Sequence, residues 1–345
     1  MNATDDTDLR GARALREWVT GEPREYARVF LVESGASAET LHGCTSPDDV
    51  VLLPAESEGH DGPAQTVRYT GSLNQIGDEL YLGARGVELQ DYIAAAFVQI
   101  LGPTVVRFAD EASWHAFLDD AELARHTGVF PTALTDPRVL LADRGALMHP
   151  AERRRPSAIR VGSGGRIGIG VHGASAVGGG QLAEVLAEPR PGVLALDGIA
   201  SETDLIADLA RHPWLPRYLT AIELVKMLRL TDGESTIAGF GWSPLADGGS
   251  DAEPLRADPF LLRTPDGFVL ADTTTLRRQL LPPATAMVVA ATQTSTTLAR
   301  AADRTARLLG IAVQDARALC RQAIQALNVH PGSAVHRSTT AEAVG

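Results

Sequence analysis

The sequence contains only two cysteines and one lysine, and each shortage excludes a class of site. Cys44 and Cys320 stand far apart, and neither has a second metal ligand nearby, so the sequence predicts neither a disulfide framework nor a cysteine-based zinc site. Lys226 lies in an apolar, helix-like stretch. No lysine is therefore available elsewhere for a phosphate-binding loop or a Schiff base. We expect both cysteines to be small buried or half-buried apolar residues.

Long apolar runs and a targeting signal are also missing. No run approaches the ~20 apolar residues of a membrane span. The first 19 residues are acidic and polar, without the basic start and apolar stretch of a secretory signal. We therefore expect a cytoplasmic protein with no membrane partner. With 345 residues, 44% of them hydrophobic and 21% charged, the chain is expected to be globular and to form two or three domains.

The net charge of −12 is unevenly distributed. Residues 260–345 carry nine arginines and no lysine against five acidic residues, a net charge of +4, so the rest of the chain carries −16. Binding to phosphates needs a basic surface. The sequence thus argues against a nucleic-acid partner for the whole molecule, although its C-terminal part is basic.

Motifs for catalysis or metal binding are absent from the sequence. The nine histidines show no H-x-x-x-H or H-x-x-E-H spacing, G-x-S-x-G does not occur, and no cysteine stands beside a histidine. Asp48-Asp49 and Asp119-Asp120 are adjacent in sequence, so their side chains diverge on a strand or a helix. We expect no catalytic residue, no metal site and no cofactor. An enzyme site assembled from scattered loops stays open.

One pattern, Gly168-Ile169-Gly170-Val171-His172-Gly173, matches the dinucleotide-binding fingerprint letter for letter. That fingerprint needs a buried strand before it and a helix that opens at its third glycine. Here glycines interrupt the preceding run, and the residues after Gly173 show no helical pattern at once. We therefore interpret the segment as a glycine-rich hairpin and loop.

The order of apolar runs and turn residues predicts a mixed α/β fold of the α+β class. An N-terminal α/β domain is expected over residues 1–150, where alternating strands and helices include a helix over 86–102. After an arginine-rich and proline-containing break, a middle α+β region is expected over 157–245. It contains a strand-turn-strand, a strand at 191–198 and a helix capped by Ser201. The Gly-, Pro-, Asp- and Ser-rich residues 243–259 read as a linker. We expect a C-terminal domain at 258–330 and a disordered tail at 331–345.

The C-terminal domain has the clearest pattern. Two apolar runs flank Pro265-Asp266-Gly267, which predicts a hairpin, and a third strand follows at Leu276–Leu281. Pro282-Pro283 then open a helix, and Ser295 is expected to cap a second helix that ends at Gly310. A third helix carries one apolar stripe: Val313, Ala316, Cys320, Ala323 and Leu327. The predicted order is three strands followed by three helices.

This segment of about 70 residues resembles the PqqD-like RiPP recognition element, a winged helix of peptide natural-product pathways. In that family a strand of the form L-x-L-N-x-T-A leads into the first helix. Leu280–Ala286, LLPPATA, is similar, including Thr285-Ala286, but it lacks the asparagine. Its fusion to a longer acidic body that contains GSLNQIGDEL and VELQDYIAAAFVQILGPTVVR resembles the daptide biosynthesis RiPP recognition proteins.

The resemblance implies a noncatalytic adaptor that binds the leader peptide of a ribosomal precursor. In the family, the peptide adds as a strand to the third strand and packs against the third helix. The implied partners are a dehydrogenase-type oxidative decarboxylase, an aminotransferase and a methyltransferase. Arginines of the site would face acidic leader side chains, although they can equally be solvated. The implied peptide-binding residues are Leu276, Arg277, Arg278, Gln279, Leu280, Leu281, Gln314, Arg317 and Arg321.

Two other functions remain open at this point. A winged helix with basic helices, here with Arg300, Arg304 and Arg307 on one face, also suits a DNA-binding regulator, although the acidic body argues against it. Alternatively, the N-terminal body can hold an enzyme site that uses the glycine-rich loop.

Overall fold

The computed structural model describes residues 3–173, 182–230 and 235–334 and has mixed α and β structure, which confirms the predicted class. The chain forms two compact units. The first comprises residues up to 120 together with 131–216, and the second comprises 121–130 and the residues from 217 onward. Within the described ranges, no helix has both the length and the apolar character of a membrane span.

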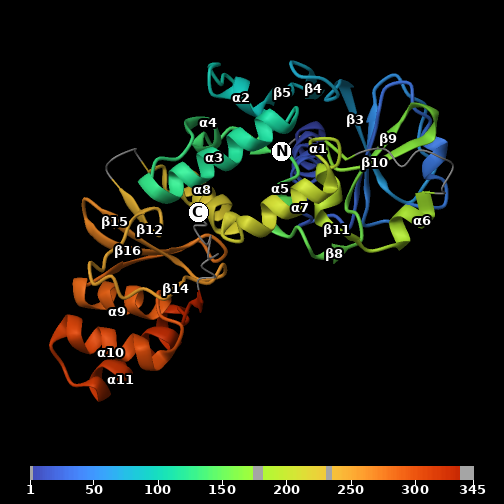
Figure 1. The fold of residues 1–345 in the computed structure, drawn as a ribbon. Helices are drawn as coiled ribbons and strands as arrows, with labels where there is room; N and C mark the ends of the chain where they lie inside the picture. The colour runs from blue at the N-terminus through green and yellow to red at the C-terminus, as the bar shows by residue number, and fades with distance from the viewer. Residues whose placement is uncertain (1–2, 174–181, 231–234, 335–345) are drawn as a thin grey trace, which may run out of the picture. The chain divides into compact units, whose positions relative to one another are not determined.

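A nine-stranded sheet forms the first unit, in the order β10-β9-β1-β2-β3-β4-β5-β6-β7 (Figure 1). Its strands are β1 (Val29–Val32), β2 (Val50–Pro54), β3 (Gln65–Gly71), β4 (Glu79–Leu82), β5 (Arg85–Asp91), β6 (Thr104–Arg107), β7 (Val139–Leu141), β9 (Ala158–Gly162) and β10 (Arg166–Ile169). Only β4 and β10 run antiparallel to their neighbours. The other seven strands are therefore parallel and end at the same edge of the sheet.

Helices cover both faces of this sheet. Strands β1 and β2 read VFLV and VVLLP and are buried throughout, as expected of parallel strands covered on both sides. Helix α1 (Ala3–Thr20) packs against one face, where the fully buried Trp18 donates from Nε1 to the carbonyl of Ile159 at 3.0 Å. On the other face, Phe30 and Leu53 belong to a second core that includes residues of helix α6 (Leu182–Ala187).

The remaining elements before residue 230 are short pieces and three longer helices. Ser201 caps α7 as predicted, because its hydroxyl accepts from the amide of Asp204. The bounds are α2 (Tyr92–Ala95), α3 (Glu111–Thr127), α4 (Thr132–Thr135), α5 (Arg144–Met148), α7 (Glu202–Arg211) and α8 (Leu215–Leu228), with a small antiparallel pair of β8 (Arg153–Arg154) and β11 (Arg190–Pro191).

The helix predicted over residues 86–102 is wrong. Residues up to Asp91 form β5 between β4 and β6, and only Tyr92–Ala95 are helical. Val87 and Leu89 are buried with the period of two that a strand imposes. Phe97 and Leu101, which suggested a helical stripe, are 85% and 78% exposed. Pairing with two neighbouring strands thus overrides the local apolar spacing.

Residues 150–216 also differ from the prediction. The expected strand at 191–198 contains a 3₁₀ helix, Gly192–Leu196. The expected domain boundary near residue 150 falls inside the first unit, because β9 pairs in parallel with β1, with Val29 opposite Ala158. The structure instead divides the middle region 157–245 near residue 216. The predicted strand-turn-strand after residue 157 is confirmed as the antiparallel pair β9 and β10.

The second unit has a five-stranded sheet in the order β13-β12-β15-β16-β17 and three C-terminal helices. Helix α9 packs against β15 and β16, and α10 and α11 pack against α9 (Figure 1). On the opposite face of the sheet, Phe260 lies under the guanidinium of the buried Arg217 from α8. The bounds are β12 (Thr236–Ala238), β13 (Gly241–Trp242), β15 (Phe260–Thr264), β16 (Gly267–Asp272), β17 (Arg277–Leu281), α9 (Pro283–Gln293), α10 (Leu298–Leu309) and α11 (Val313–Leu327).

The segment predicted to be a linker, residues 243–259, packs onto this unit. Leu245 joins the core of the three helices, and Ala252 is buried. Strand β14 (Ala252–Glu253) pairs with β18 (Ser333–Ala334), so the first part of the expected tail is held in a strand pair. Residues 335–345 of that tail lie outside the described residues. The cap of α10 is Thr297 instead of the expected Ser295.

Candidate functional site

Strand β17 lies at the edge of the five-stranded sheet, where, among the described residues, one side of its backbone has no neighbouring strand. It pairs on the other side with β16, Leu270 opposite Gln279 and Asp272 opposite Arg277. Four of its five residues are exposed. An exposed edge of this kind is a template for adding a further strand.

The side chains of β17 divide between the two faces of the sheet, because neighbouring residues on a strand point in opposite directions. Leu281 joins the core with the C-terminal helices, and Gln279 and Arg277 lie on that same face. Arg278 and Leu280 lie on the other face, where Leu280 is 64% exposed. The arginine pair therefore cannot act together on one side of a bound peptide.

Leu276, the first residue of the predicted strand, belongs to the turn before β17. It has a left-handed backbone conformation with φ of +57° and a side chain that is 69% exposed. Such a conformation is uncommon for a residue other than glycine, asparagine or aspartate. The turn thus presents an apolar side chain to solvent at the entrance of the edge strand.

Two cavities of about 230 Å³ each lie against α11: residues of β17 line the first, and residues of α9, α10 and α11 line the second. The first is bounded by β16, β17 and the end of α11, and its lining includes Asp272, Arg277 and Gln279. The second lies between α9 and α11 and is mainly apolar, with Val288 and Leu309 in its lining. Both cavities share Ala326 and Leu327 of α11. We call these two neighbouring cavities together the edge groove; its lining comes from β17, the end of α11 and α9.

Helix α11 is the wall of the edge groove, but it uses a different flank from the one predicted. At 100° per residue, the buried stripe of Ala316, Cys320 and Ala323 separates two flanks. The flank in the groove carries Leu319, Gln322 and Ala326, and the other carries Gln314, Arg317 and Arg321. The structure therefore does not bring Gln314, Arg317 and Arg321 to either cavity. The exposed apolar Leu319, outside the buried stripe, was the sequence signal for the correct flank.

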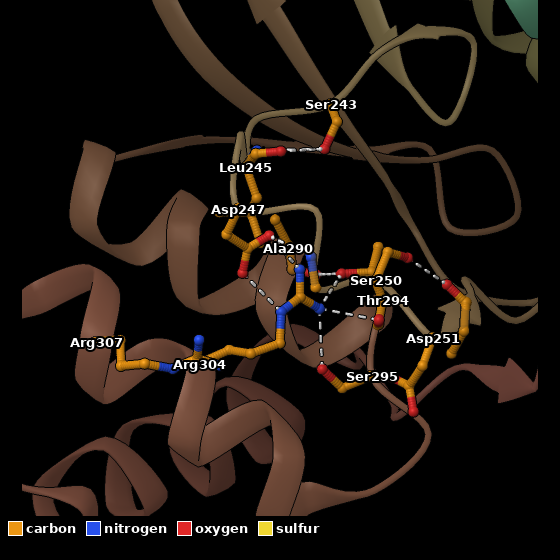
Figure 2. Close-up of polar contacts among 12 residues, drawn as sticks. Ser243, Leu245, Asp247, Ser250, Asp251, Ala290, Thr294, Ser295, Arg304 and Arg307 are labelled. Carbon is orange, nitrogen blue, oxygen red and sulfur yellow. Dashed lines mark hydrogen bonds and ion pairs between the residues drawn. The ribbon is translucent and has the colours of Figure 1, made fainter.

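The buried side of the same unit holds an arginine with a complete set of partners (Figure 2). Arg304 on α10 is 3% exposed and donates from Nε and Nη2 to the two carboxylate oxygens of Asp247, each at 2.9 Å. Its Nη1 donates to the carbonyl and hydroxyl of Thr294 and to the hydroxyl of Ser295. Through Arg304, the segment that contains Asp247 is bound to α9 and α10.

This contact changes the interpretation of the basic face on α10. Arg304 points into the protein and is paired with Asp247, while Arg300 pairs with Asp251 at 3.0 Å. The Arg304 guanidinium, through its hydrogen bonds to Asp247, also lowers the pKa of that carboxyl group. Two of the three arginines that suited a DNA-binding helix are thus neutralised by the segment that precedes β15.

The glycine pattern at 168–173 binds a carboxylate of the protein itself. The amides of Val171 and His172 donate to the Asp143 carboxylate at 3.0 Å. Gly170 has a φ of +73°, and a Cβ there would lie 2.1 Å from Asp143 Oδ1. The glycine is therefore required by this close approach. The amides that a phosphate would need are already occupied.

Burial strongly perturbs the groups around this loop. Desolvation raises the pKa of Asp143 to about 7, against the opposing effects of its two amide donors and of Arg160 and Arg107. Desolvation, helped by the charges of Arg107 and Arg160, lowers the pKa of His172 to about 3. His172 is consequently neutral at physiological pH.

Among the described residues, no group of three or more His, Cys, Asp and Glu side chains is arranged to hold a metal ion. Cys44 is half-buried and Cys320 is buried, both as free thiols, which confirms the expectation for the two cysteines. Comparison of the chain with protein-family models, curated protein sequences and solved structures finds no match.

Proposed function

We propose that this protein is a noncatalytic adaptor that binds the leader region of a ribosomal precursor peptide in the edge groove and presents it to modifying enzymes. The single observation that carries the proposal is that β17, the strand expected to receive the peptide, is an edge of the sheet within the described chain and lines a cavity that α11 also borders. Strand addition at such an edge derives affinity from backbone hydrogen bonds and specificity from pockets for alternate side chains.

The order of elements supports the same proposal. Three strands, β15 to β17, are followed directly by three helices, as in the winged-helix elements that the sequence resembles. The peptide would lie along β17, with alternate side chains directed toward Leu319, Gln322 and Ala326 of α11. Arg277 is the arginine of β17 that lines the groove and could contact an acidic leader side chain.

The proposed partners are the leader peptide and the enzymes that modify the remainder of the precursor. The resemblance suggests a dehydrogenase-type oxidative decarboxylase, followed by an aminotransferase and a methyltransferase. The DNA-binding alternative is weakened by the pairing of Arg300 and Arg304 with Asp251 and Asp247.

The test is fluorescence polarisation with labelled leader peptides encoded by short reading frames beside the gene. We expect saturable binding that weakens at least tenfold in Ala326→Glu, because a charge would then occupy the groove. Arg317→Glu, on the opposite flank of α11, is the matched control and should bind as the wild type does. Circular dichroism checks that both variants fold. Equal affinity in the two variants would exclude the groove.

A scan of N-methylated peptides tests strand addition itself. Successive backbone N–H groups of an added strand point alternately toward and away from β17. Methylation should therefore weaken binding at every second position, and loss with a period near 3.6 would indicate a helical peptide instead. A random DNA duplex serves as the second ligand. Binding of DNA without binding of any leader peptide would contradict the proposed function.

A further inference from the structure

Polar side chains gather in the first unit on the face of the sheet that α1 covers. On β1, Val29 and Leu31 face the α1 core, and Glu33 follows two residues later in the same direction. On β6, Val105 belongs to the same core, and Arg107, two residues later at the end of the strand, points in the same direction. Arg160 follows Ala158 on β9, and its guanidinium lies 5.5 Å from the centre of the Trp18 ring. Glu33 and Arg107 thus lie at the carboxyl ends of their strands, whereas Arg160 lies in the middle of β9, opposite Leu31 of β1.

Each of the two arginines has a nitrogen that the described chain leaves without an acceptor. Desolvation and the charge of Arg160 lower the pKa of Arg107, while the carboxylates of Asp78, Asp91 and Asp143 raise it. The side chain of Arg107 makes no ion pair with a carboxylate of the described residues, and its Nε is buried without a hydrogen-bond partner. Arg160 donates from Nη2 to the carbonyl of Val171, while its Nη1 lies 3.7 Å from Glu33. Its Nε is also buried and unpartnered within the described chain.

His172 supplies a third unsatisfied nitrogen. Its ring stacks on Phe108 with centroids 6.2 Å apart, and Nε2 is buried with no partner among the described residues. The charges of both arginines act on this ring. Arg160 donates to the carbonyl of Val171, the residue before His172, and Phe108, on which His172 stacks, directly follows Arg107. The two arginine Nε–H groups can only donate.

The neighbouring carboxylates are committed to other contacts. Asp143 accepts from the amides of Val171 and His172. Asp91 accepts from the amides of Ile93, Ala94 and Ala109, and Asp78 from Ser72, Asn74 and Gln75. A buried donor without an acceptor destabilises the folded chain, and a charged donor does so more strongly. The cluster thus has an excess of donors that the chain itself does not satisfy.

We propose that Arg107, Arg160 and His172 form a binding site for an oxyanion, the carboxylate or phosphate group of a ligand. Arginine suits this role because its planar fork matches the geometry of both groups, and a charged acceptor makes the stronger kind of hydrogen bond. The site is separate from the edge groove and does not depend on peptide binding there.

The test follows the arginine Nε–H signals in ¹H–¹⁵N NMR spectra of the full chain during titration with inorganic phosphate or sodium acetate at constant ionic strength. Arg107→Lys and Arg160→Lys assign the two signals. We expect both to shift saturably with at least one anion, while the signal of Arg166, exposed on β10, stays unchanged. Saturation with phosphate alone assigns a phosphate ligand, and saturation with acetate alone assigns a carboxylate.

A binding measurement with variants completes the test. By calorimetry, Arg107→Gln should weaken binding of the same anion at least tenfold, whereas Arg166→Gln should leave it unchanged. The shifts in the wild-type protein remain a readout if Arg107→Gln does not fold. Absence of saturable shifts with either anion, or equal shifts at all arginines, would overturn the proposal.

Discussion

Arg304 of the second unit and Arg107 of the first unit both have buried guanidinium atoms, but the folded chain supplies acceptors to them unequally. Arg304 has five hydrogen bonds, two of them to Asp247, and closes a structural contact. Arg107 has a buried Nε without a partner and a second arginine beside it. The difference teaches that burial alone does not identify a functional arginine. A buried arginine is a candidate ligand-binding residue when the folded chain leaves some of its N–H donors without an acceptor.

The largest expected effect is on the paired arginine. Arg304→Met should lower the free energy of unfolding by about 4 kcal/mol, because it leaves Asp247, Thr294 and Ser295 without their shared donor. Urea denaturation followed by circular dichroism measures this loss. The control is Arg300→Met, whose exposed pair with Asp251 should contribute about 1 kcal/mol or less. Equal losses in the two variants would contradict the structural role of Arg304.

The next largest effect is expected from Asp143, the buried acid of the first unit, which should make the free energy of unfolding depend on pH. Folding raises the pKa of Asp143 from 3.8 to about 7, so the folded state retains a proton that the unfolded chain releases. The contribution of Asp143 to stability therefore falls as pH rises from about 4 to about 7 and is constant above that range.

Asp143→Asn removes this titration. We expect the stability of the wild type relative to Asp143→Asn to fall by about 3 kcal/mol between pH 4 and pH 7.5. Denaturant unfolding of both proteins at a series of pH values measures the difference. His172 titrates in the opposite sense but is present in both proteins. A difference that rises with pH would mean that Asp143 is stabilised in its charged form.

A smaller effect on stability is expected at the N-cap of α10, which is Thr297. The hydroxyl of Thr297 accepts from the amide of Arg300, so Thr297→Ala should cost about 1 kcal/mol, while Thr297→Asn should retain most of the stability. Thermal denaturation of the two variants is sufficient. A loss of equal size in Thr297→Asn would show that the hydroxyl does not act as a cap.

The smallest effect is expected for the unpaired arginine. Without added anion, Arg107→Met should change the free energy of unfolding by less than about 0.5 kcal/mol, because no ion pair is lost and an unsatisfied donor is removed. With phosphate or acetate present, only the wild type should gain stability. A large loss without anion would assign Arg107 a structural role like that of Arg304.

Elements that depend on contacts between nearby residues were predicted correctly, whereas elements that depend on contacts between distant segments were not. The hairpin around Pro265-Asp266-Gly267 and the Ser201 cap were predicted correctly, because turn and cap residues act within a few positions of the chain. Residues 86–102 were misassigned because the pairing of β5 with β6 is not encoded in local spacing. Sequence spacing also did not indicate which flank of α11 lines the two cavities, since that depends on how α9 packs against α11.

The sequence by itself determined the mixed class, the order of three strands and three helices near the C-terminus, and the basic character of that segment. Local apolar patterns and turn chemistry are sufficient for these features. Only the tertiary structure decided that β17 is an edge, that Arg304 is neutralised by Asp247, that Arg160 donates to the carbonyl before His172, and that His172 stacks on the residue after Arg107. These contacts join segments far apart in the chain, a relation that local sequence cannot express.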